Sequence, residues 1–145
     1  MDFDAKIIIE WKELGFYYQR DDDLKQWWLI GSKGGLASFL KELSDYANDP
    51  SFQGVSEHIH IGPHQYLKIM TWHVPIINSD CIGGSLFDLK RLKAIIEHKL
   101  SITNIGEIFL VGKDYAIQNE YLIRFFVMAD SFDPSSIEFD SNHGF

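Results

Sequence analysis

The sequence predicts an α+β fold with two layers: a mainly antiparallel sheet and helices packed on one face of it. Two observations indicate this class. Strand-like segments come in pairs separated by polar turns, as in hairpins. A double glycine introduces an amphipathic helical pattern twice, at Gly34-Gly35 and, 49 positions later, at Gly83-Gly84. The recurrence suggests a duplicated unit of two strands and one helix (ββα).

The N-terminal part is predicted to contain a helix, a hairpin and a second helix. Apolar residues between positions 7 and 14 recur at helical spacing, and Gly15 would end this first helix. Residues 16–20 and 24–30 flank a polar turn and are rich in aromatic and branched side chains, which predicts a hairpin. The second helix should run to about Ala47, because a proline follows shortly after.

The middle of the chain reads as extended structure. Residues 55–61 alternate between apolar and polar side chains, which is typical of a strand with one solvated face. Residues 66–72 form an apolar strand after a Gly-Pro turn. Residues 75–82 form a further extended piece, which its proline places at an edge or makes irregular.

The C-terminal part begins with the strongest helical pattern of the chain. One stripe of this helix carries five apolar residues: Leu86, Leu89, Leu92, Ile96 and Leu100. Residues 107–111 and 121–128 are predicted strands, and the second is apolar on both faces apart from Arg124. Residues 130–145 form an acidic tail that we expect to fray.

The composition describes a single globular domain, residues 1–145. The chain is 46% hydrophobic and 23% charged, and its length suffices for a core without disulfide staples. Its single cysteine, Cys81, excludes an internal disulfide, which fits a reducing compartment. No apolar run approaches the ~18 residues of a membrane helix, and the acidic start is unlike a signal peptide. We therefore expect a cytoplasmic protein that does not enter a membrane.

The net charge bears on the class of partner. The formal charge is −8, and no basic stripe of the kind that nucleic acid prefers is visible. Nucleic-acid binding is therefore disfavoured. A negative charge of this size suits a basic protein partner, because it speeds the diffusional encounter.

The strongest metal-like cluster is His58-Ile59-His60 with His64. Two histidines in a His-x-His pattern on a strand lie on one face, where they could share a metal ion with a third ligand such as His64. The carboxylate that known metal motifs add at fixed spacing is missing here. The competing interpretation is a pair of solvent-facing histidines on a half-exposed strand, and a metal-dependent enzyme using these residues remains the alternative hypothesis.

Other motifs for catalysis or cofactor binding are incomplete. The glycine-rich residues 31–35 lack the spacing of a P-loop, so they read as the start of a helix. Cys81 has no evident base beside it in the sequence, so a small buried thiol is the simpler interpretation. The sequence therefore predicts a protein that is not an enzyme and has no cofactor.

Acidic and aromatic residues together indicate a protein-binding surface. The turn Asp21-Asp22-Asp23 lacks the pattern of a calcium loop and could form an acidic contact patch. A two-layer fold leaves one face of its sheet uncovered, and Trp27, Trp28 and Trp72 are candidates to stand on that face. We predict that these six residues contact a protein partner. The same surface could instead be buried under a twin subunit, giving a homodimer.

As a whole the chain resembles the small acidic immunity proteins of bacterial polymorphic toxin systems. The resemblance rests on size, acidity, the single-domain α+β pattern and two stretches, Gly83-Gly84-Ser85-Leu86-Phe87-Asp88-Leu89 and His64-Gln65-Tyr66-Leu67-Lys68-Ile69-Met70-Thr71-Trp72. It implies a cytoplasmic protein that binds a cognate toxin, such as a basic toxin domain, and blocks it without catalysis. Such families vary in fold, so the resemblance assigns no functional residue.

Overall fold

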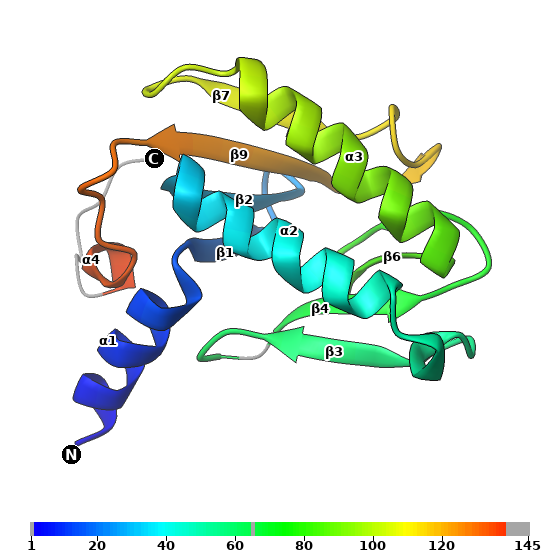
Figure 1. Cartoon of the computed structure of the whole chain (residues 1–145), viewed down its shortest axis with the longest axis horizontal. Helices are drawn as coiled ribbons and strands as arrows, with labels where there is room; N and C mark the ends of the chain where they lie inside the picture. The colour runs from blue at the N-terminus through cyan, green and yellow to red at the C-terminus, as the bar shows by residue number, and fades with distance from the viewer. Residues whose placement is uncertain (1, 65, 139–145) are drawn as a thin grey trace.

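The computed structural model describes residues 2–64 and 66–138 and confirms the α+β class (Figure 1). The helices are α1 (Phe3–Leu14), α2 (Lys33–Ala47), α3 (Leu86–Ile102) and the short α4 (Ser135–Glu138), with a 3-10 turn at Pro50–Phe52. Helices α2 and α3 pack against each other in front of the strands, and α1 and α4 pack together at one side. Within the described ranges, no helix has the length and apolar character to cross a membrane.

The strands form two sheets, not the single sheet that the sequence predicts. The first contains, in spatial order, β1 (Tyr17–Asp21), β2 (Gln26–Ser32), β9 (Leu122–Met128) and β7 (Ile108–Val111). The second contains β3 (His58–Ile61), β4 (Leu67–Thr71), β6 (Ile82–Gly84), β5 (Ile76–Ile77) and β8 (Gln118–Asn119). Antiparallel pairing predominates, as predicted, but β2 with β9, β4 with β6 and β5 with β8 are parallel.

The chain consists of two halves with the same order of elements, ββαββ. The first half runs from β1 to β4 and the second from β5 to β9, with β8 as an addition. Each half gives its last hairpin to the sheet of the other half. The hairpin β3–β4 pairs with β6, and the hairpin formed by β7 and β9 pairs with β2. The repeated unit is therefore larger than the predicted ββα, and the exchange creates the parallel pair at the centre of each sheet.

The two halves also match in individual backbone hydrogen bonds. Ser56 and Gly106 stand just before the exchanged hairpins, and both have left-handed backbone angles, with φ of 75° and 90°. The N–H of Ser56 donates to the carbonyl of Thr71 at 2.9 Å, and that of Gly106 donates to the carbonyl of Val127 at 2.7 Å. A chance likeness in the order of elements would not reproduce this detail, so the repetition is structural.

The two long helices align at a spacing of 53 residues, not at the 49 suggested by the double glycines. Their N-caps are Ser32 and Ser85, and each hydroxyl accepts a hydrogen bond from the third residue of its helix. At this spacing the buried positions coincide: Leu36, Phe39, Leu43 and Ala47 match Leu89, Leu92, Ile96 and Leu100. The difference of four residues is about one helical turn. A shift of one turn leaves an apolar helical pattern almost unchanged, so the sequence pattern did not reveal the error.

The predicted acidic tail is partly structured. Residues Ser135–Glu138 form α4, and Ile137 is buried. The side chain of Asp133 lies 3.8 Å from Lys12 of α1, which brings the start of the tail against that helix. The expectation of fraying is therefore wrong for this part of the tail, while residues 139–145 lie outside the described residues.

A close backbone contact joins the end of α1 to the start of α2. Gly15 ends α1 in the left-handed conformation, with φ of 92°, and its N–H donates to the carbonyl of Trp11. A Cβ atom on Gly35 would lie only 2.0 Å from the carbonyl oxygen of Gly15. A Cβ atom on the neighbouring Gly34 would meet nothing within 4 Å. Of the two glycines in this pair, only Gly35 is required by packing.

Alanine substitutions should separate these two glycines. We expect Gly35→Ala to lower the free energy of unfolding by about 1–3 kcal/mol, because the added methyl group forces α1 and α2 apart. We expect Gly34→Ala to be neutral or to stabilise by up to about 1 kcal/mol, since alanine is the better helix former. Urea denaturation of both variants measures the difference. Equal effects of the two substitutions would contradict the contact.

Candidate functional site

Residues 72–75 form an exposed connector between β4 and β5. These two strands lie on opposite sides of β6 in their sheet, so the connector has to cross the end of β6, where α3 begins. The N–H of Trp72 donates to the carbonyl of Gly84 at 2.9 Å, which fixes the start of the connector at this point. Two hollows in the surface border the connector.

The first, which we call the connector hollow, has a volume of about 390 Å³. Its lining comes from three segments of the chain: Gln53, Val55, Thr71, Trp72, His73, Ser85, Leu86 and Phe87. Phe87 is 74% exposed and Val55 is 47% exposed, while Trp72 and Leu86 are half-buried. The hollow therefore presents apolar and aromatic surface directly to solvent.

Hydrogen bonds through Thr71 hold the frame of this hollow. The hydroxyl of Thr71 donates to the carbonyl of Phe52 at 2.6 Å and lies 2.7 Å from the hydroxyl oxygen of Tyr46. The rings of Tyr46 and Phe52 stack with their centroids 4.3 Å apart. Burial raises the pKa of the Tyr46 hydroxyl, so this group stays neutral. These contacts tie β4 to α2 and to the 3-10 turn, so the lining is largely preformed.

The predicted acidic patch is mostly engaged within the chain. One carboxylate oxygen of Asp21 accepts the N–H of Leu24 at 2.9 Å, across the turn between β1 and β2. Asp22 accepts the hydroxyl of Tyr121 at 2.7 Å and forms an ion pair with Arg20, also at 2.7 Å. The hydrogen bond from Tyr121, and then that from Arg20, hold the pKa of Asp22 below its usual range. Of the three, only Asp23 has no such contact among the described residues.

Two of the three predicted aromatic contact residues are buried. Trp27 is 0% exposed, and its indole N–H donates to the carbonyl of Asn78 at 2.8 Å. Trp28 is 5% exposed and donates to the side chain of Gln26 at 2.8 Å. The expectation that one of these rings stands on an open sheet face is wrong, because Trp27 stacks with Tyr66 and Trp28 lies against Phe126. Only Trp72 of the three lines a hollow at the surface.

The structure brings together two of the three predicted metal-ligating histidines. The rings of His58 and His60 lie on β3 with their centroids 5.1 Å apart. His64 instead lies beside Trp11 and Tyr66, with ring centroids 6.0 and 6.3 Å away. Over residues 2–64 and 66–138, no three His, Cys, Asp or Glu side chains are grouped so that they could hold a metal ion.

Cys81 lies in the core. It is 0% exposed, and burial raises the pKa of its thiol to about 11. The thiol is therefore protonated near neutral pH and shielded from reagents in solution. This geometry fits a packing role, as the sequence indicates.

Sequence reasoning missed Phe87 and Val55. Phe87 lies in the first turn of α3 but outside the apolar stripe of this helix, and a large aromatic residue at an outward position was the available signal. Val55 was assigned to a strand, whereas β3 begins only at His58. Their proximity to Trp72 depends on the exchanged hairpins, which no local pattern reveals.

Comparison with known proteins gives no relative. A scan against protein-family models, a search of curated proteins and a search of solved structures each found no match. Function is therefore inferred from the geometry and chemistry of the chain itself.

The contacts of Asp22 predict a specific dependence of stability on acid. A carboxyl whose folded-state pKa lies below its unfolded value of about 3.8 stabilises the fold above that pH and loses the effect as pH falls through the lower folded value. We expect Asp22→Asn to lower the Tm at neutral pH, and we expect the difference from the native chain to shrink between about pH 5 and pH 2.

Asp23→Asn is the matched control, because it removes the adjacent charge without removing those contacts. Thermal unfolding followed by circular dichroism over this pH range measures both variants. A Tm difference for Asp22→Asn that stays constant with pH would contradict the assignment.

Proposed function

We propose that the chain is a non-enzymatic protein-binding module that contacts its partner through the connector hollow. The observation that carries the proposal is the grouping of Trp72, Phe87 and Val55, from three separate segments, around one solvent-facing hollow. Aromatic residues such as tryptophan and phenylalanine are enriched in protein–protein interfaces, and tryptophan is among the residue types that most often form hot spots.

The exposure of Phe87 favours a macromolecular partner. Burying a phenylalanine side chain stabilises a fold or a complex by roughly 1.5–3 kcal/mol. The Phe87 ring is 74% exposed, so most of this free energy is not gained in the folded monomer. A partner that covers the ring would gain it on binding. The frame held by Thr71 and Tyr46 adds to the effect, because a preformed surface loses little conformational entropy on binding.

The charge of the chain favours a basic partner. The net charge is −8, and three glutamates that line a separate hollow near α1 have no ion-pair partner among the described residues: Glu10, Glu13 and Glu42. Such a field attracts a basic protein from a distance, so these side chains need not lie in the interface. They take over the steering role that the sequence gave to Asp21-Asp22-Asp23.

The partner class that we propose is the cognate toxin domain of a bacterial toxin–immunity pair, which this chain would bind and neutralise in the cytoplasm. The resemblance in size, acidity and α+β pattern supports this class. A second copy of the chain seated on the same hollow is the competing occupant, and the experiment below separates the two.

Substitutions in the hollow should weaken binding to a basic toxin domain encoded beside the gene for this chain. We expect Phe87→Ala and Trp72→Ala each to raise the Kd by about 10–30-fold, the effect of losing one hot-spot residue. Isothermal titration calorimetry measures the change. Phe3→Ala is the matched control, because Phe3 is 72% exposed on α1, far from the hollow in the sequence, and should leave the Kd unchanged.

Sedimentation of the chain alone provides the second readout. A monomer that binds the toxin domain supports the proposal. Self-association that Phe87→Ala abolishes would instead assign the hollow to a homodimer. Equal effects of Phe3→Ala and Phe87→Ala on the Kd would show that the hollow is not the contact surface.

A further inference from the structure

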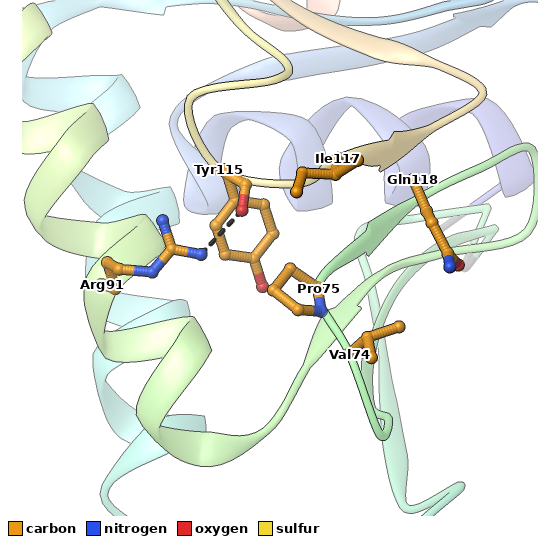
Figure 2. Close-up of a pocket in the computed structure, with 6 residues that line it drawn as sticks. All are labelled: Val74, Pro75, Arg91, Tyr115, Ile117 and Gln118. Carbon is orange, nitrogen blue, oxygen red and sulfur yellow. Dashed lines mark hydrogen bonds between the residues drawn. The ribbon is translucent and has the colours of Figure 1, made fainter.

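The second hollow beside the connector, which we call the Arg91 pocket, has a volume of about 360 Å³. It is lined by Val74, Pro75, Arg91, Tyr115, Ile117 and Gln118. Figure 2 shows Arg91 on one side of the Tyr115 ring and Ile117 and Gln118 on the other. The volume lies in the range of small-molecule sites, which combine an apolar lining with a few fixed polar groups.

The guanidinium of Arg91 is held in place without being neutralised. It donates to the carbonyl oxygens of Asp114 and Tyr115 at 3.2 and 2.6 Å, and it lies 4.9 Å from the centre of the Tyr115 ring (Figure 2). Among the described residues no carboxylate lies within ion-pair distance of it. The nearby Asp88, one turn back on α3, instead accepts the N–H of the N-cap residue Ser85.

Among the described residues, half of the other twelve lysine and arginine side chains are neutralised locally. These six form ion pairs with a carboxylate: Lys12, Arg20, Lys41, Lys68, Lys93 and Lys99. A guanidinium carries five N–H groups, and Arg91 uses two of them on carbonyl oxygens. Arg91 therefore places an uncompensated charge, with donors to spare, at one end of an apolar pocket.

Tyr115 forms the floor of the pocket and adds no charge to it. Tyr115 is 3% exposed, and its hydroxyl donates to the carbonyl of Gly83 at 2.7 Å. Burial raises the pKa of this hydroxyl, so it stays neutral and is already used in the fold. Val74 and Ile117 are 39% and 91% exposed, and they offer apolar surface at the mouth of the pocket.

Comparison of the two halves shows how the second differs from the first at this pocket. At the helix spacing of 53 residues, Arg91 takes the place of Ser38, and Asp88 takes that of Gly35. In the first half the carbonyl of Gly15 approaches Gly35 so closely that no side chain fits between them, and Gly15 also lies against Ser38. The second half has the larger Asp88 and Arg91 at these two positions, and the pocket lies beside Arg91.

We infer that the Arg91 pocket binds an apolar group that ends in a carboxylate. The carboxylate would accept hydrogen bonds from the free N–H groups of Arg91, which match its planar geometry. The apolar body would lie against Tyr115, Pro75 and Ile117. A free aliphatic or aromatic acid and the C-terminal residue of a polypeptide share this chemistry. The inference does not depend on the proposed function, because the Arg91 pocket and the connector hollow share no lining residue.

The test is an NMR titration of the ¹⁵N-labelled chain with phenylacetate and with its neutral analogue phenylacetamide. We expect phenylacetate to shift the amide signals of residues 74, 91 and 115–118, and to bind about tenfold or more tightly than the amide, because the charge-assisted hydrogen bonds are lost in the analogue. A tripeptide ending in phenylalanine, with a free or amidated C-terminus, forms the second pair. Preference for the acidic tripeptide over phenylacetate identifies a polypeptide C-terminus as the source, and equal binding identifies a small acid.

Ile117→Glu introduces a carboxylate at the mouth of the pocket, where it repels the carboxylate of the ligand. The substitution does not disturb the core, because Ile117 is 91% exposed. We expect it to weaken phenylacetate binding about tenfold. Ile102→Glu makes the same change at a 67% exposed position elsewhere and should have no effect. Equal affinity for acid and amide, equal effects of the two substitutions, or signal shifts outside the pocket would each overturn the inference.

Discussion

The parallel pairing of strands from different halves is the constraint on which the rest of this structure depends. Strand β2 bonds to β9, and β4 bonds to β6, so each sheet is complete only when it receives the hairpin of the other half. The helices α2 and α3 then cover both sheets from one side (Figure 1). The two halves therefore form one interlocked unit, although each repeats the same order of elements.

This exchange also decides where functional surface can arise. Because β4 and β5 flank β6, the chain between them must pass over the end of β6 at the start of α3, and its four residues remain near the surface. The connector hollow and the Arg91 pocket both border this crossing. In the first half the corresponding contact with the helix is closed by Gly15 and Gly35. The candidate site thus lies at a place where the two halves of the chain differ in structure.

Local patterns in the sequence predict the helices and strands well, but they predict poorly which strands pair with one another. The apolar stripe of α3, the hairpin of β1 and β2 and the presence of a repeat all follow from periodicity and turns. The parallel pairs do not follow from these local signals, because the sequence of a strand does not indicate which distant strand it will pair with. The same limit applies to the site. Trp27 and Trp28 were expected at the surface and are buried between elements, whereas the role of Phe87 becomes visible only once the connector brings Trp72 beside it.

The central claim is that a protein partner covers the connector hollow, and hydroxyl-radical footprinting tests it most directly. The chain is oxidised alone and in complex with the proposed toxin partner, and oxidation of each aromatic residue is quantified by mass spectrometry. The account predicts that the oxidation rates of Phe87 and Trp72 fall several-fold in the complex, while that of the equally exposed Phe3 does not change. Protection of Phe3 with no protection of Phe87 and Trp72 would contradict it.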